Sequence, residues 1–339
     1  MTGLSRWITR SLAALLAAAG LAGAGGCASS ATRVAVDAAS VDNARAATVA
    51  PVQVAPGVYL LQGSGGEPAV GNLGRIGNAG FIVGDSGVVA IDTGTSYRHG
   101  EALLAAIRSV TDKPVRLALI THARQEFLFG AAAYRARGVP VAMHSRAASL
   151  MASRCETCLK NLRKLLGEDA MRGTVMFTPD RSFEVTHRDD TLADRPLQVL
   201  YFGHSSGPGN IVVFDPRTGV LFAGGLLDRG RIPDVIDGDL AEWRAALQAL
   251  RGLPVKLVVP GHGDAGDSER SIADVERYLA QLEARVHALM GADTPLSQIA
   301  EAASLPDFEA WDQYDNTHRR NASIVFLRIE REALFKIGG

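Results

Sequence analysis

Three histidines are the residues of this 339-residue chain whose surroundings best suit chemistry. His122 stands in the run THARQEFLFG, His204 in GHSSGPGN and His262 in PGHG. Each follows a short run of apolar and β-branched residues, a pattern that predicts a buried strand. Imidazole nitrogens bind zinc and transfer protons near neutral pH, so these strand ends are the first candidates for a functional site.

Strand-like and helix-like segments alternate along the chain, which predicts a layered α/β domain over residues 51–339. The predicted strands are 57–62, 81–83, 88–92, 115–120, 139–143, 183–185, 196–202, 211–214, 220–223 and 255–259. The predicted helices are 98–110, 127–135, 145–166, 240–250, 271–290 and 321–334, with Ser145 as a helix N-cap. A histidine that leaves a strand and enters a helix lies at the carboxyl edge of the sheet, where ligands usually bind.

Four segments in this order resemble the motifs of the metallo-β-lactamase superfamily. His122, Arg124, Glu126 and Phe127 fall at the positions of its H-x-H-x-D-H signature, so only the first histidine is kept. The segment 92–94, read DTG, resembles its supporting "IDTG" element. The GHSSG and PGHG segments resemble its later ligand motifs. The resemblance covers roughly residues 55–270 and implies a four-layer αβ/βα sandwich.

The resemblance also implies a ligand set for two metal ions, and this chain lacks much of it. The first ion would use His122 and His204, but Arg124 stands at its third position. The second ion would use His262 and perhaps Glu126, whereas its other two positions hold Phe127 and Gly225 in this chain. Gly225 replaces the aspartate that bridges the two ions in the family.

At most one zinc ion is therefore expected. Arg124 carries a fixed positive charge and cannot act as a ligand, and the Phe127 ring has no lone pair to offer. A single ion would need His122, His204 and His262 to meet at about 2.0–2.1 Å from a common centre. Glu126 would either bind that ion or pair with Arg124, and we assign these two residues as the catalytic candidates.

Two functions follow, and the sequence does not choose between them. One is residual single-metal hydrolysis of a small ester, amide, lactone or thioester substrate. The other is a non-catalytic role in which a metal-free crevice binds an anionic ligand or a protein partner. The loop 228–234, read DRGRIPD, places two arginines near the predicted crevice, where they would bind an anion or simply face solvent. The general layout resembles the exported subgroup associated with quinoprotein systems.

Cys155 and Cys158 form a C-x-x-C pair within a predicted helix. A local disulfide or two reduced thiols is the simplest interpretation, because no second Cys/His pair lies nearby to complete a zinc site. A thiol-redox function is a third hypothesis, although the strand that precedes a thioredoxin-like motif is missing. His144, at another predicted strand end, is expected either to enter the crevice or to be hydrogen-bonded elsewhere.

The N-terminus reads as an export signal. Residues 1–26 combine a basic start with a short apolar stretch, and Cys27 follows in a setting similar to a bacterial lipoprotein box. Residues 27–50 are rich in small residues and are expected to form a flexible tether. We therefore expect a periplasmic protein anchored through a lipid on Cys27, with no other membrane contact. A competing cut after Ala31 would instead release a soluble protein. The formal net charge of −1 gives no indication of a nucleic-acid partner.

Overall fold

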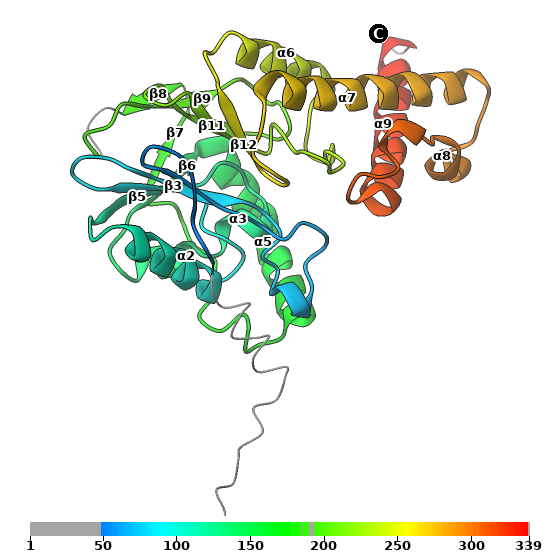
Figure 1. The fold of residues 1–339 in the computed structure, drawn as a ribbon. Helices are drawn as coiled ribbons and strands as arrows, with labels where there is room; N and C mark the ends of the chain where they lie inside the picture. Colours follow the sequence, from blue (N-terminus) through cyan, green and yellow to red (C-terminus); the bar gives the residue numbers. More distant parts are fainter. Residues whose placement is uncertain (1–48, 185, 190–192, 338–339) are drawn as a thin grey trace, which may run out of the picture.

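The computed structural model describes residues 49–184, 186–189 and 193–337 (Figure 1). The predicted signal peptide, Cys27 and nearly all of the predicted tether lie outside these residues, so export and lipidation stay predictions. Among the described helices, none is both long enough and apolar enough to cross a membrane.

Seven strands form the first sheet, in the same order as they occur in the chain. Neighbouring strands are antiparallel from β1 to β4 and parallel from β4 to β7. These strands are β1 (Val52–Ala55), β2 (Val58–Leu61), β3 (Ala79–Val83), β4 (Val88–Ile91), β5 (Val115–Leu119), β6 (Val141–His144) and β7 (Arg181–Phe183).

Five strands form the second sheet, in the order β12-β11-β10-β9-β8. The β11–β12 pair is parallel and the other pairs are antiparallel. These strands are β8 (His187–Asp189), β9 (Leu197–Tyr201), β10 (Ile211–Asp215), β11 (Val220–Gly224) and β12 (Leu257–Pro260).

Helices cover the outer face of each sheet (Figure 1). Those on the first sheet are α2 (Tyr97–Val110), α3 (Gln125–Leu128), α4 (Ala131–Arg135) and α5 (Ser145–Leu166). Those on the second sheet are α6 (Leu240–Arg251) and α7 (Ser268–Gly291), followed by α8 (Leu296–Ala302) and α9 (Arg319–Ile337). Three single-turn helices complete the described elements: η1 (Val70–Asn72), η2 (Pro306–Phe308) and η3 (Tyr314–His318).

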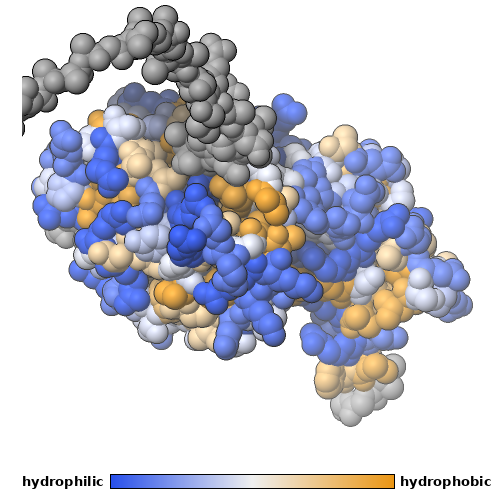
Figure 2. Space-filling view, turned by 90° about the horizontal axis from the view of Figure 1, so that it is seen from below, coloured by the Kyte–Doolittle hydropathy of each residue, from blue (hydrophilic) through white to orange (hydrophobic). Residues whose placement is uncertain are grey.

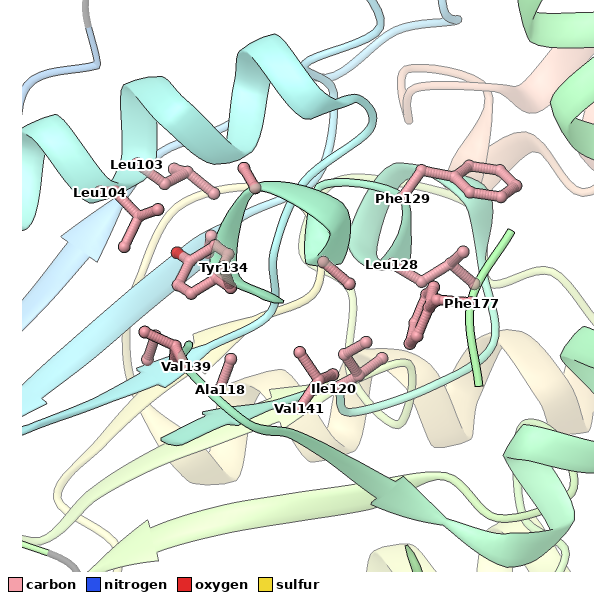
Figure 3. Close-up of a cluster of buried hydrophobic side chains, with 14 of the residues drawn as sticks. Leu103, Leu104, Ala118, Ile120, Leu128, Phe129, Tyr134, Val139, Val141 and Phe177 are labelled. Atoms are coloured by element: carbon pink, nitrogen blue, oxygen red, sulfur yellow. The ribbon is translucent and has the colours of Figure 1, made fainter. Parts of the chain in front are cut away.

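Three hydrophobic clusters separate these layers. The first lies between the seven-stranded sheet and its helices, where Leu103 of α2 and Tyr134 of α4 pack near Val141 of β6 (Figure 3). The second lies between the two sheets and includes Ile82 and Phe222. The third lies under α6 to α9. The predicted four-layer αβ/βα sandwich is thus confirmed, because each sheet buries one face on the other sheet and one on helices.

Two local details differ from the prediction. The helix expected over 127–135 is interrupted, because the N–H of Gly130 bonds to the Gly94 carbonyl at 2.8 Å and not to its own helix. The predicted N-cap Ser145 is the first residue inside α5. His144 takes the cap position, and its Nδ1 accepts from the Arg146 N–H at 3.2 Å.

The surface is mixed. The face in Figure 2 carries hydrophilic side chains over most of its area, with hydrophobic side chains gathered in smaller patches. Exposed large apolar residues include Leu334 and Phe335 near the end of α9. Scattered exposed apolar side chains are normal for a globular protein and indicate no particular function.

A buried ion pair ties the two halves together. Arg195 donates to both carboxylate oxygens of Asp215 on β10, at 3.1 and 2.6 Å, and both side chains are almost fully buried. The same guanidinium donates to the carbonyls of Val83, at the end of β3, and Pro56, in the turn between β1 and β2. One side chain therefore satisfies acceptors from both sheets.

We predict that Arg195→Leu lowers the free energy of unfolding by about 3–5 kcal/mol, because it leaves the Asp215 carboxylate buried without its partner. Urea unfolding followed by circular dichroism would measure the change. Arg217→Leu is the matched control, because Arg217 is half-exposed and 3.9 Å from its acidic partner Asp85. Equal losses in the two variants would contradict the prediction.

Candidate functional site

A crevice of about 560 Å³ opens where β5, β11 and β12 end. Its walls come from the loops after these strands, from one face of α5 and from the junction of η3 with α9, at Gln313, Thr317 and Arg320. The crevice thus lies at the carboxyl ends of β5, β11 and β12, the kind of place at which the sequence predicted a site. The crevice-facing residues used below are His122, Arg124, Glu126, Cys155, Cys158, Asp228, Asp234, Asp237, His262 and Arg320.

His122 is held from behind by Asp92 and Thr121. The Asp92 carboxylate accepts from the Thr121 N–H at 2.8 Å and from its hydroxyl at 2.8 Å. That hydroxyl also lies 2.8 Å from His122 Nδ1. Burial raises the pKa of Asp92 to about 7. When Asp92 is ionised the hydroxyl donates to it, and Nδ1 is then the donor to Thr121, which leaves Nε2 as an acceptor. The DTG segment thus supports the histidine as its resemblance implied.

His262 is positioned by an amide and two carboxylates. The Asn78 side chain donates to the carbonyls of Pro260 and Gly263, at 2.9 and 2.8 Å, and so fixes the loop on both sides of the histidine. His262 Nδ1 lies 2.9 Å from Asp228 and Nε2 lies 3.4 Å from Glu126. The imidazole is therefore enclosed between two acids.

The two histidines differ in protonation because their neighbours differ. Burial lowers the pKa of His122 to about 3, so its ring is neutral. Burial also opposes the charge on His262, but Asp228 and Glu126 outweigh it and raise the pKa of His262 to about 9. Burial likewise acts to raise the pKa of Glu126, yet His262 and Arg124 lower it to about 2. His262 and Glu126 thus form a buried ion pair at neutral pH.

Phe127 lies against both histidines. Its ring centroid is 4.3 Å from that of His122 and 5.3 Å from that of His262. The side chain is fully buried and packs closely on Gly77, where even a methyl group would collide with the ring. An apolar ring thus occupies the neighbourhood in which the family motif would place a histidine.

Arg124 faces the crevice. Its Nη1 donates to Asp234 at 2.9 Å, and its Nη2 lies 3.9 Å from Asp237. Burial opposes the charge, but Asp234, Glu126 and Asp237 raise the Arg124 pKa above its ordinary value. Asp234 also accepts from Arg320 at 2.7 Å, and Asp237 pairs with Arg154. Arginine and aspartate side chains therefore alternate along this wall.

His204 does not join the other two histidines. Its ring Nε2 lies 2.7 Å from the Asp237 carbonyl, and its backbone N–H donates to the Glu242 carboxylate. It lines a separate depression beside α9, whereas Ser206 and Asn210 of the same loop reach the crevice. The expected cluster of His122, His204 and His262 is thus not assembled in this structure, because the GHSSG loop directs its histidine to the other side.

His144 also stays outside the crevice. Its Nε2 lies 2.9 Å from the Glu184 carbonyl, and its ring stacks on Tyr201 with centroids 4.0 Å apart. This is the hydrogen-bonded alternative that the sequence left open. The arginines of the 228–234 loop separate, because Arg231 lines the crevice and pairs with Asp312 while Arg229 bonds to the Asp264 carbonyl.

The donor set does not fit a metal ion. Within the described ranges, no three His, Cys, Asp or Glu side chains are grouped closely enough to hold one. Both nitrogens of His262 already lie beside carboxylates, and Arg124 adds a fixed positive charge that would repel a divalent ion. A side chain at Gly225, where the bridging aspartate would be, would meet the His122 ring at 2.9 Å.

The sequence did not single out most of the acidic side chains that complete this site. Asp228 pairs with His262, Asp234 with Arg124 and Arg320, and Asp237 with Arg154. Asp228 and Asp234 stand at the ends of the DRGRIPD loop, in which the sequence had indicated a role only for the two arginines. The signal that could have found them is the need of a buried Arg124 for an acidic partner.

We predict that the His262 ion pair makes stability depend on pH. A folded-state pKa of about 9 against an ordinary 6.5 means that its contribution is complete below pH 6.5 and is lost as the pH rises through 9. The stability gap between the wild type and His262→Gln should narrow by up to about 3 kcal/mol between pH 6 and pH 10. Urea unfolding at both pH values measures it, and the exposed His287→Gln serves as control. An unchanged gap would refute the assignment.

Comparison with known proteins agrees with the fold. The family model described as the metallo-beta-lactamase superfamily matches residues 73–262. A metallo-beta-lactamase from Pontibacter korlensis superposes with a TM-score of 0.57 at 24% identity, covering 69% of this chain and 99% of that one. A Pseudomonas aeruginosa metallo-beta-lactamase in its mono-zinc form gives a TM-score of 0.53 at 20% identity, covering 69% and 96%.

Curated relatives match this chain over only part of their own length. A linear primary-alkylsulfatase of Pseudomonas is 22% identical over 61% of this chain and 45% of its own length. A type 2 metallo-beta-lactamase of Bacteroides fragilis is 34% identical over 23% of this chain and 34% of its own. The chain thus spans about half or less of these two relatives. The family match covers more than half of this chain and includes His122, Arg124 and His262, so the protein belongs to the metallo-β-lactamase superfamily.

Proposed function

We propose that this protein is a metal-independent member of its superfamily whose crevice binds a small anionic ligand. The observation that carries the proposal is Arg124, which stands at a metal-ligand position of the family motif and is held in the crevice by Asp234 at 2.9 Å. A guanidinium repels a divalent cation and offers planar N–H donors to a carboxylate, phosphate or sulfate group.

An excess of hydrogen-bond donors supports an anion over a cation. A guanidinium has five N–H donors, and among the described contacts Arg124 uses one of them in a hydrogen bond. His262 Nε2 lies 3.4 Å from Glu126, an ion-pair contact that lacks hydrogen-bond geometry. The carboxylates nearby are already engaged by Arg124, Arg320 and His262. The N–H groups of Arg124 that no described contact uses are thus left, and an acceptor-rich ligand would pair with them.

The relatives add one hint about the class of anion. The name of the alkylsulfatase relative describes action on a linear alkyl sulfate, which joins an anionic head to an apolar tail. The crevice of this chain has polar walls around Arg124 and apolar positions at Ile76, Leu150 and Ile236. A short alkyl sulfate is therefore a suitable first probe, alongside inorganic sulfate.

We predict that the purified protein retains well below one zinc or iron ion per chain, even after dialysis against zinc. His122→Ala and His204→Ala should leave that content unchanged, because the described donors do not converge on one ion. Inductively coupled plasma mass spectrometry provides the measurement. About one ion per chain that disappears in His204→Ala would overturn the proposal and restore single-metal hydrolysis of a small ester or thioester.

We predict that hexyl sulfate binds the wild type and that Arg124→Met weakens binding by roughly tenfold or more, because one charge-assisted fork of hydrogen bonds is lost. Isothermal titration calorimetry gives the dissociation constants, and Arg124→Lys tests whether charge without the planar fork suffices. Arg172→Met is the control, since Arg172 is exposed and lies outside the crevice. Equal affinities for all four proteins would exclude Arg124 as the anchor.

A further inference from the structure

The thiols of Cys155 and Cys158 lie on the crevice wall, and neither the proposed ligand site nor any hydrolysis uses them. Both are free cysteines on α5. The crevice-facing side of that helix is formed by Leu150, Arg154, Cys155, Cys158 and Asn161. These positions recur at helical spacing, so the two thiols share one face and look onto the same space.

We propose that Cys155 and Cys158 form a redox-active dithiol that exchanges with small disulfides entering the crevice. The proposal goes beyond the anion-binding function and is independent of it, because thiol–disulfide exchange needs neither a metal nor Arg124 as a ligand anchor. The substrate class is a low-molecular-weight disulfide. The product state of the protein is a disulfide within α5.

The helix geometry permits that disulfide. Three residues along an α-helix advance about 4.5 Å and turn by about 300°, which puts the two Cα atoms about 5 Å apart. Protein disulfides span Cα separations of roughly 4.4–6.8 Å, so the Cα spacing fits. The Cβ atoms of such a pair lie about 5–6 Å apart against the roughly 3.5–4.5 Å of a disulfide, so one turn of α5 has to shift locally when the bond forms. The ring closed by the bond contains two intervening residues, so it restrains the unfolded chain little and the bond is readily reversed.

The two thiols differ in the way that a stepwise exchange requires. Cys158 is partly exposed at the crevice, whereas Cys155 is 2% exposed. A hydrogen bond from the Cys155 thiol lowers the pKa of Cys158, and the positive charge of Arg124 acts in the same direction. The same hydrogen bond and burial raise the pKa of Cys155. The accessible sulfur is thus the thiolate that attacks, and the buried sulfur is the one that follows.

The reaction has two steps. The Cys158 thiolate attacks one sulfur of the small disulfide; a bond forms between them, the small S–S bond breaks, and one thiolate leaves and takes a proton from water. Cys155 then loses its proton, attacks the Cys158 sulfur and expels the second small thiolate. The two protein thiols are oxidised to one disulfide, and the small disulfide is reduced to two thiols. Export, as the N-terminal sequence predicts, would place the pair where disulfides persist.

Oxidised glutathione is the probe, applied to the reduced full-length chain. Trypsin cuts after Arg154 and Lys160, so both thiols fall in the peptide 155–160, apart from Cys27. We expect this peptide to lose two hydrogens. In Cys155→Ser the reaction should stop at a glutathione adduct on Cys158, whereas in Cys158→Ser the adduct on Cys155 should form at least roughly tenfold more slowly, because that sulfur is buried.

Serine is close in size to cysteine, and matching thermal unfolding curves for both variants would establish that they fold. The same chain unfolded in urea shows that the reagent is active. A peptide that stays reduced in the folded wild type while it reacts in urea would overturn the proposal. Equal adduct rates in the two variants would overturn it as well. Neither result depends on metal content or on hexyl sulfate binding, so this test and those of the proposed function fail separately.

Discussion

The ion pair between Arg124 and Asp234 is the constraint on which the character of the crevice depends. A guanidinium cannot lose its proton at physiological pH, so once it stands in a partly desolvated site it must be given acidic partners. Asp234 supplies the nearest carboxylate at 2.9 Å, and Asp237 lies at 3.9 Å. These acids in turn pair with Arg320 and Arg154. The arginine at this histidine position of the family motif is thus accompanied by a series of ion pairs along one wall of the crevice.

At the opposite end of the crevice, His262 is likewise paired with acidic side chains. In the family this histidine would give a lone pair to a metal, whereas here Asp228 and Glu126 favour its protonated form. Phe127 then separates it from the neutral His122 with an apolar ring. The Glu126 carboxylate, the His262 imidazolium and the Phe127 ring fill the space between the two loops. The charges of Glu126 and His262 balance each other.

The sequence predicted the fold and the location of the site better than it predicted which residues make up the site. The strands that end at His122 and His262 could be predicted, because a buried strand shows in the local sequence as a run of apolar residues. The direction of His204 depends on how its loop packs against Glu242 and the Asp237 carbonyl, which lie more than thirty residues away. The partners of Arg124 come from 110 residues away, on a loop with no periodic pattern. Long-range pairing of loop residues leaves no such signal, so the ion-pair wall emerged only with the structure.

The supporting contacts explain why the fold tolerates a rebuilt site. Asp92 holds Thr121 through two hydrogen bonds at 2.8 Å, and Asn78 holds the loop around His262 through two carbonyls. None of these bonds involves a metal ligand's lone pair, so they keep both loops in place whatever fills the crevice. The contacts that stabilise the loops are therefore different from the contacts that would carry out the chemistry of the site. A chain can exchange ligand residues for ion pairs without losing the scaffold, provided that each new charge finds a partner within the crevice.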